Sequence, residues 1–362
     1  MQTTRRVRMG VIGAGAWAVA SHLPVLAARA DEVEFVAVSR IGAAPLAKVQ
    51  RQFGFAVASE DYRDVLAQGL DACIISSPAG LHHQHAKAAL ESGAHVLVEK
   101  PFTLTASDAW DLVDTAARLG RHIVVAFGNN YLPMVVSFEE LLAAKGGVGR
   151  LEQCMLSMHS CMREVLTTGE SYPEASGGDI PKPEPATWID RDLSGGGYAN
   201  AQLTHVLGLA LRLMGTEPSE VFALTGTRPG DPVELHDAIA LRFPGGAVGT
   251  LTGGSSWVGA DGSRDMIALR VIGSQGQWKL DLDTEQAWVF RQGDTVEERL
   301  ELQPGAGIYD CVGPPNALID LAMGRDVVNR SPGALAASTV EVLEAVYRSA
   351  ASGSMARVIA RA

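Results

Sequence analysis

Lys100 stands at a position where a lysine can take part in chemistry. The apolar run 94–98 has the pattern of a buried strand, and Glu99, Lys100 and Pro101 follow it directly. An ammonium group at the mouth of a parallel strand loses hydration, so its pKa is easily displaced. Pro101 fixes the chain direction and prevents the strand from continuing. Lys100 is therefore a candidate catalytic residue, although a structural ion pair with Glu99 would use the same residues.

A glycine-rich segment near the start of the chain has the spacing of a dinucleotide-binding turn. The apolar run 7–12 precedes Gly-Ala-Gly-Ala-Trp-Ala at positions 13–18, and a helix-like stretch follows. Gly13 permits a tight turn, Gly15 lets backbone amides reach a pyrophosphate, and Ala18 lets the helix pack close to the strand. The order of strand, turn and helix predicts a bound dinucleotide. An ordinary tight turn is the alternative.

The end of the second apolar run bears on which dinucleotide is bound. The run 33–38 ends at Ser39 and Arg40, where an NAD-selective site would place an acidic residue for the ribose 2′-hydroxyl. A hydroxyl and a guanidinium suit a 2′-phosphate instead, through charge-assisted hydrogen bonds. The sequence predicts NADP, with NAD still possible. A solvated arginine at a strand end is the alternative role for Arg40.

Length and composition limit the class of protein. A chain of 362 residues predicts two domains, and 47% hydrophobic with 20% charged residues is typical of a soluble globular protein. The formal charge of −11 argues against a nucleic-acid partner. No apolar run is long enough to span a bilayer.

Two features indicate a cytoplasmic protein. Arg5 and Arg6 imitate a twin-arginine export signal, but the apolar residues after them are needed for the first strand. The four cysteines form no Cys-x-x-Cys pair, which favours idle thiols in a reducing compartment.

The order of elements predicts how the candidate residues meet. Strand-like and helix-like stretches alternate from residue 7 to 127, which predicts a doubly wound parallel sheet with ligands at the carboxyl ends of its strands. Several polar or glycine residues fall at such ends and should converge on one cleft: Gly13, Ser39, Ser77, Lys100 and Asn129. Runs of strands with few helices follow, which predicts an α+β domain with a mainly antiparallel sheet over 128–362.

Two further stretches offer groups for a substrate. Asn129 and Tyr131 follow the last strand of the first series, and either bind substrate or build the hinge between domains. A loop from 167 to 194 is long enough to be functional. Its Trp188 could stack on a pyranose face, although an exposed connector would look the same.

With these motifs in place, the chain resembles the glucose–fructose oxidoreductase/inositol dehydrogenase family (Gfo/Idh/MocA). The resemblance rests on four segments and their spacing: 13–18 with His22 beyond, 77–82, 99–101 and 195–205. It implies an N-terminal Rossmann domain (1–127) and a C-terminal open-faced sheet whose exposed side serves oligomerisation, as a homodimer or homotetramer. It also implies a cofactor in the first domain and a sugar or polyol at the interface.

The resemblance assigns a second catalytic residue. The family's lysine falls on Lys100 and its motif histidine on His205, with Gln202 close by. Acids that many members carry near that histidine are replaced by Ala201 and Gly208. Our hypothesis is that His205 exchanges the proton while Lys100 orients and polarises the reacting oxygen. Without the carboxylates, either residue could be the principal base, and His205 could instead be a core histidine.

The predicted sites are then as follows. The cofactor residues are Gly13, Gly15, Ala16, Trp17, Ser39, Arg40, Ser77, Pro78, His82, Glu99, Lys100 and Pro101. The substrate residues are Lys100, Asn129, Tyr131, Trp188, Gln202 and His205. No metal site is predicted, because the run His82-His83-Gln84-His85 has no carboxylate or cysteine at a useful spacing.

The predicted function is hydride transfer between a nicotinamide cofactor and a sugar, polyol or glycoside. One alternative is glycoside cleavage or epimerisation with no net redox change, in which the hydride is lent and returned. The other is a regulator that senses nucleotides without catalysis. Retained Lys100 and His205 count against the regulator, and the two missing acids count slightly for it.

Overall fold

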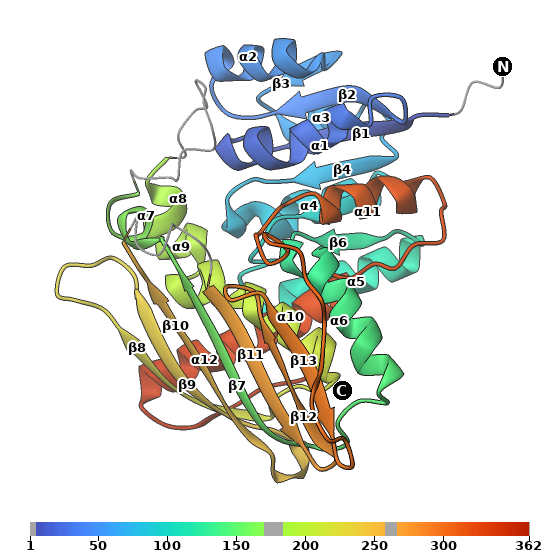
Figure 1. Cartoon of the computed structure of the whole chain (residues 1–362). Coiled ribbons are helices and arrows are strands. Elements are labelled where there is room, and N and C mark those ends of the chain that lie inside the picture. Colours follow the sequence, from blue (N-terminus) through green and yellow to red (C-terminus); the bar gives the residue numbers. More distant parts are fainter. Residues whose placement is uncertain (1–4, 170–183, 258–265, 362) are drawn as a thin grey trace.

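Residues 7–127 form a parallel sheet with helices on both faces, as the alternation of elements predicts (Figure 1). The computed structural model describes residues 5–169, 184–257 and 266–361. The strand order is β3-β2-β1-β4-β5-β6, and all neighbouring pairs are parallel. The strands are β1 (Val7–Ile12), β2 (Val33–Ser39), β3 (Val57–Ser59), β4 (Ala72–Ile75), β5 (His95–Val98) and β6 (Ile123–Val125).

Helices connect these strands and cover both sides of the sheet. They are η1 (Ala18–His22), α1 (Leu23–Ala28), α2 (Ala43–Phe53), α3 (Tyr62–Leu66), η2 (Ala79–Leu81), α4 (His82–Glu91) and α5 (Ala106–Leu119). Because both faces are covered, β4 and β6 are buried along their whole length, which explains their unbroken apolar sequences. Helix α5 begins where the Thr105 side chain accepts the Asp108 N–H, and it ends at Gly120 with a positive φ. The Rossmann arrangement predicted from the sequence is confirmed.

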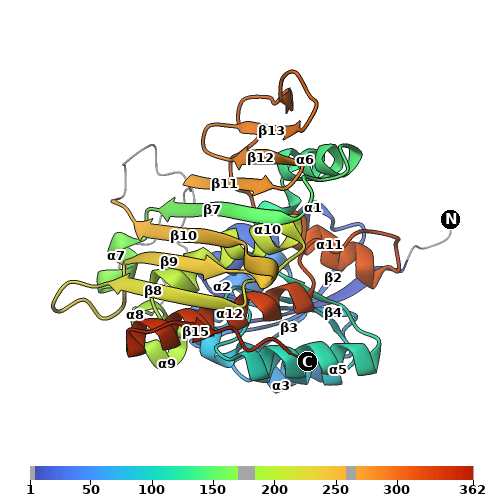
Figure 2. The ribbon, with the colours of Figure 1, turned by 90° about the horizontal axis from the view of Figure 1, so that it is seen from below.

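The second unit is built on a nine-stranded sheet, seen from below in Figure 2. Its order is β14-β13-β12-β11-β7-β10-β9-β8-β15, antiparallel throughout except for the parallel pair β7 and β10. The strands are β7 (Leu151–Ser160), β8 (Glu220–Gly226), β9 (His236–Arg242), β10 (Val248–Ser255), β11 (Met266–Gly273), β12 (Gly276–Asp281), β13 (Gln286–Arg291), β14 (Glu298–Arg299) and β15 (Ala356–Arg357). The predicted mainly antiparallel sheet is confirmed.

One face of this sheet is covered and the other is open. Residues of β9 alternate strictly between exposed and buried, as expected for a sheet with one solvated face. Helices α10 (Thr204–Met214) and α12 (Gly333–Ser352) lie on the buried face (Figure 2). The remaining helices are η3 (Gly128–Tyr131), α6 (Pro133–Ala144), α7 (Arg163–Thr168), α8 (Ala186–Ile189), α9 (Arg191–Ser194), η4 (Ala199–Leu203), η5 (Pro244–Gly246) and α11 (Gly313–Ala322).

The C-terminal part of the chain returns to the N-terminal unit. Leu318 and Ile319 of α11 belong to the same buried cluster as Val11 of β1. Ala336 and Val340 of α12 complete the cluster on the other side of that sheet. The two predicted units, 1–127 and 128–362, therefore do not have independent cores, because residues beyond 313 complete the core of the first.

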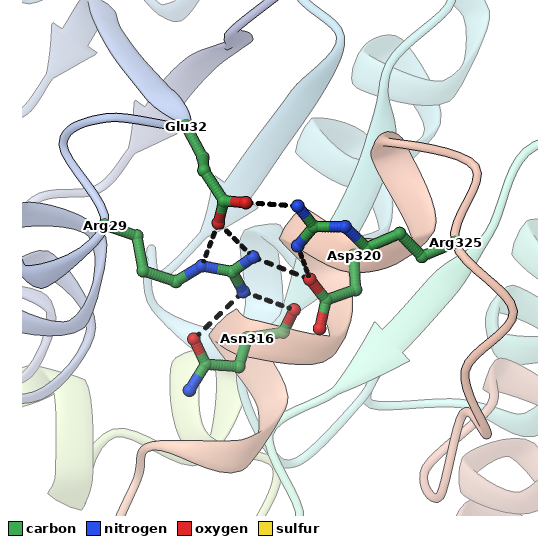
Figure 3. Close-up of polar contacts among 5 residues, drawn as sticks. All are labelled: Arg29, Glu32, Asn316, Asp320 and Arg325. Carbon is green, nitrogen blue, oxygen red and sulfur yellow. Dashed lines mark hydrogen bonds and ion pairs between the residues drawn. The ribbon is translucent and has the colours of Figure 1, made fainter. Parts of the chain in front are cut away.

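A cluster of charges fastens α11 to this unit at the surface (Figure 3). Arg29, at the end of α1, pairs with Glu32 and with Asp320 of α11, and Arg325 contacts the same two acids. Asn316 accepts two further hydrogen bonds from Arg29 through its side-chain and main-chain oxygens. The hydrogen bonds from Arg325 and Arg29 lower the pKa of Glu32 to about 2. Such a network holds geometry better than an isolated surface pair does.

No helix in the described part of the chain combines the length and the apolar composition that crossing a bilayer requires.

Candidate active site

A cavity of about 740 Å³ lies between the two units, at the carboxyl ends of the parallel strands. Its volume is in the range of small-molecule and cofactor sites. All twelve residues predicted to contact the cofactor line it, from Gly13 to Pro101. Lys100, Trp188, Gln202 and His205, predicted for the substrate, line it too. The predicted residues therefore make up half of the residues that line one cavity.

The glycine-rich turn has the geometry that a bound pyrophosphate requires. Gly13 has φ +80°, and a Cβ there would lie 2.4 Å from the backbone nitrogen of Ser77, so a side chain is excluded. A Cβ on Gly15 would meet no atom closer than 3.9 Å, which leaves the backbone open to a ligand. The N–H groups of Gly13 and Ala14 donate to the carbonyl of Ser39, which ties the turn to the end of β2.

The end of β2 places Arg40 beside this turn. Its Nη1 donates to the carbonyl of Ala14 at 3.2 Å, so the guanidinium lies against the glycine-rich segment. Glu60 and Tyr62 line the same cavity but are missing from the sequence prediction. The register explains their position, because Ser59 of β3 pairs with Ser39 of β2 and both strands end side by side. The pairing order of the strands, which the sequence alone does not give, was the missing signal.

Lys100 connects the two units. Its Nζ donates to the carbonyl of Ala201 in η4 at 2.9 Å. The preceding Glu99 is buried, with Oε1 2.6 Å from Nε2 of His22 and Oε2 accepting the Lys100 N–H. Burial alone would raise the pKa of Glu99, but His22 and Lys100 lower it, so this carboxylate is ionised. The peptide bond between Lys100 and Pro101 is cis.

His82 joins the ends of β4 and β5. Its Nδ1 lies 2.8 Å from the carbonyl oxygen of Pro101, and its Nε2 lies 2.8 Å from that of Ser77. His85, one turn later, contacts the Ser77 hydroxyl at 2.9 Å. His83 points elsewhere and contacts Asp111 at 2.7 Å. The three histidines are thus bonded to protein oxygens, and two of them fix the floor of the cavity.

His205 faces Lys100 from the other unit. It lies in the first turn of α10, is 4% exposed, and meets the rings of Phe127 and Tyr309 edge-on. Burial, and then the charge of Lys100, hold the pKa of His205 well below its usual value, so the imidazole is neutral at pH 7. Among the described residues, no group hydrogen-bonds to its Nδ1.

The structure shows what surrounds the two positions near His205 where this sequence lacks an acid, Ala201 and Gly208. A Cβ on Gly208 would lie 2.8 Å from the ring of Phe127, so an acidic side chain there would have to displace that ring. Ala201 is 7% exposed and lines the cavity, and its carbonyl already accepts the Lys100 bond. The main chain of η4 thus helps to position the lysine.

Two predicted substrate residues lie elsewhere. Neither Asn129 nor Tyr131 lines the cavity, and the Tyr131 hydroxyl is engaged with Asn329 and Ser331. The Tyr131 hydroxyl thus fastens the segment before α12. Of the predicted long loop, 170–183 lie outside the described residues, while Trp188 falls in α8.

Tyr309 is a cavity residue that sequence reasoning missed. Its ring lies 6.5 Å from that of Trp17, in a stacked orientation, and 5.8 Å from that of His205. It belongs to the segment between β14 and α11, which carries no recognisable motif. A second missed feature is the buried group of His22, Glu99 and Cys311, whose donor atoms lie within 4.8 Å of one another. Cys311 comes from 289 residues beyond His22, so no spacing rule reveals the contact.

Comparisons with known proteins identify the family of this chain. Residues 7–127 match the model of the GFO_IDH_MocA oxidoreductase family with an NAD-binding Rossmann fold, and residues 170–279 match the GFO/IDH/MocA C-terminal domain. The NADP⁺-dependent D-xylose 1-dehydrogenase 2 of Haloferax volcanii is 28% identical over 66% of this chain and 66% of its own length. An uncharacterized oxidoreductase of Escherichia coli is 25% identical over 95% of this chain and 96% of its own length.

A solved structure shares the whole architecture. Levoglucosan dehydrogenase in complex with NADH and levoglucosan superposes with a TM-score of 0.78 at 20% identity, covering 98% of this chain and 100% of that one. At this identity the likeness establishes the fold.

Proposed function

The chain belongs to the Gfo/Idh/MocA oxidoreductase family, and we propose that it transfers a hydride between NAD(P) and a hydroxyl or carbonyl carbon of a sugar or polyol. The observation that supports this most is the meeting of Lys100 and His205, from separate units, in one cavity lined by a glycine-rich turn. Curated relatives named as dehydrogenases of xylose, levoglucosan and scyllo-inositol support the substrate class.

The cavity fits a dinucleotide. A side chain is excluded at Gly13, while the backbone at Gly15 is open to a ligand, as a bound pyrophosphate requires. When bound, the nicotinamide accepts or donates the hydride. Trp17, Ser77, Pro78 and the turn 99–101 would hold its far end beside Lys100.

Lys100 and His205 would handle the proton. The Lys100 ammonium, which donates to the carbonyl of Ala201, would donate to the substrate oxygen when the substrate is bound. In the oxidative direction the hydroxyl proton passes to the neutral imidazole of His205 while the carbinol C–H bond breaks and a carbonyl forms. In the reductive direction the Lys100 ammonium polarises the carbonyl oxygen.

Arg40 supports a preference for NADP. It lies against the glycine-rich turn at the end of β2, where an acidic residue would select NAD, and a guanidinium suits a phosphate in charge and shape. Glu60, at the end of the neighbouring strand, places an opposing charge in the same cavity. The preference for NADP over NAD is set by these two side chains.

The test is a screen of sugars and polyols with NAD⁺ and NADP⁺, following reduced cofactor by absorbance. Turnover that is lost in Lys100→Met, while cofactor binding is retained, supports the proposal. A tightly bound nucleotide that is reduced and reoxidised without added cofactor would favour chemistry with no net redox change. Cofactor binding with no turnover of any sugar or polyol would contradict the enzymatic function.

A further inference from the structure

Cys311 lies in a setting unlike that of the other three cysteines. It precedes α11 and packs behind the cavity wall formed by Tyr309 and Glu99. Its sulfur lies 3.8 Å from Nδ1 of His22 and 3.8 Å from the Tyr309 hydroxyl, which donates to it. The other ring nitrogen of His22 is held by Glu99 at 2.6 Å. The order Cys311, His22, Glu99 is that of a nucleophile, a base and the group that orients the base.

Three features of its surroundings favour Cys311 as a nucleophile. Glu99, ionised and buried, stabilises a positive charge on His22, and that imidazolium faces the sulfur. Burial alone would lower the pKa of His22, but Cys311 and Glu99 together raise it to about 10. Cys311 also stands one residue before the N-cap of α11, a helix of ten residues, whose dipole favours negative charge at that end.

Cys161 provides an internal comparison. Cys161 and Cys311 are both 8% exposed, so burial does not separate them. The described contact of the Cys161 sulfur is with the Ser256 hydroxyl at 3.5 Å, and no imidazole is among its contacts in the described part of the chain. Cys73 and Cys154 are fully buried, and burial raises the pKa of Cys154 to about 12. Of these four thiols, Cys311 alone combines a histidine, a second donor and a helix start.

We propose that Cys311 is a modification site, where the sulfur attacks small uncharged electrophiles while the adjacent His22 takes the thiol proton. With an alkyl halide, the bond from sulfur to carbon forms, the bond from carbon to halogen breaks, and halide leaves. The thiol proton stays on His22, so no further reactant is needed.

Modification should also disturb the cavity. A group attached to Cys311 would press on His22 and Tyr309, and through His22 on the carboxylate that holds the Lys100 turn. The part of the proposal that concerns inhibition rests on the proposed function. The part that concerns reactivity does not.

Iodoacetamide tests the reactivity on the native, full-length protein. Peptide mass spectrometry gives the rate at each cysteine, and we expect Cys311 to react at least about tenfold faster than Cys161, because an imidazole lies beside its sulfur and none is described beside that of Cys161. In Cys161→Ser the rate at Cys311 should not change. In His22→Gln, which keeps the side chain polar but cannot hold the proton, Cys311 should slow to about the rate of Cys161. Equal rates at the two cysteines in the parent protein would overturn the proposal, as would an unchanged Cys311 rate in His22→Gln.

A second variant covers the case in which His22→Gln does not fold. Tyr309→Phe removes one donor to the sulfur with little change of volume, and Cys311 should react severalfold more slowly. An unchanged rate there would contradict the proposed activation of Cys311 by its neighbours. Turnover should be lost at the same rate as Cys311 is alkylated, and the Cys311→Ser variant should keep its turnover in iodoacetamide. Rapid alkylation in a protein that turns over no sugar would refute the proposed function and leave the modification site standing.

Discussion

The two walls of the cavity differ in how completely their polar groups are satisfied. On the Rossmann side, Glu99 is held by His22, and His82 bridges the carbonyls of Ser77 and Pro101. On the opposite side, Nδ1 of His205 is buried, and no described residue hydrogen-bonds to it.

We call the Rossmann wall prebuilt, because its polar groups are paired within the protein, and the opposite wall open, because it contains a polar atom without a partner among the described residues. A buried polar atom without a partner costs about 1–3 kcal/mol, so a protein retains one where a function requires it. The Rossmann wall needs no ligand to complete it, which suits a cofactor common to many relatives. The opposite wall has a buried polar atom that a ligand could pair, which suits the proposed binding of a substrate there.

Replacing Lys100 by methionine tests the comparison most strongly, because this residue joins the two walls. Methionine keeps the length and loses the charge, so turnover should fall by at least about a thousandfold, while the prebuilt wall keeps cofactor affinity within about threefold. Steady-state rates and quenching of tryptophan fluorescence, with Trp17 in the cavity wall, measure the two effects. Lys87→Met, which removes a surface pair with Asp111, is the matched control and should change neither. Parental turnover in Lys100→Met would remove the catalytic role.

His22→Gln should weaken the prebuilt wall itself. Breaking a buried ion pair costs about 3 kcal/mol, and we expect a loss of stability near that size at pH 6. The pKa of His22 is raised to about 10 in the folded protein, so its stabilisation is complete below an unfolded pKa of about 6.5 and is lost as pH rises through 10. Denaturant unfolding of parent and variant from pH 6 to 10 should show the gap between them closing. A gap that stays constant with pH would mean that His22 is not charged in the folded state.

Sequence reasoning succeeded where function requires a local pattern. The turn at Gly13, the end of β2 and the segment 99–101 are each read from a few adjacent residues, because backbone geometry demands those residue types. All three then meet in one cavity, because the carboxyl ends of parallel strands share one edge of a sheet.

The missed residues depend on contacts between distant segments. Tyr309 and Cys311 reach the site on a segment without a motif, and their partners Trp17 and His22 lie almost 300 residues earlier. Nothing in their own neighbourhood predicts that return. The structure shows one local feature that the sequence does not reveal. Ala18–His22 and Ala199–Leu203, the latter just before His205, are both π-helices, and such turns are frequent at functional sites.

Arg40→Ala tests whether the Rossmann wall is built for a phosphate. Loss of one charge-assisted contact should lower kcat/KM with NADP⁺ by about tenfold and leave kcat/KM with NAD⁺ within about threefold. Steady-state kinetics with both cofactors give the ratio. Arg51→Ala, an exposed arginine in the last turn of α2, is the matched control and should leave it unchanged. An equal loss with both cofactors would show that Arg40 supports the glycine-rich turn and does not select the phosphate.

Ala201→Asp tests whether a carboxylate introduced on the open wall can pair with His205. Position 201 lies four residues before His205 and faces the cavity, so a carboxylate there has room beside the imidazole. A nearby negative charge favours the imidazolium, so the pKa of His205 should rise from its lowered value. The acidic limb of the kcat/KM profile for oxidation, where the base must be neutral, should move up by about one pH unit. Ala201→Asn has nearly the same size without the charge and should leave the limb in place. If the aspartate also left it in place, the proton would be exchanged by another group, and Lys100 would have to serve as both base and polarising donor.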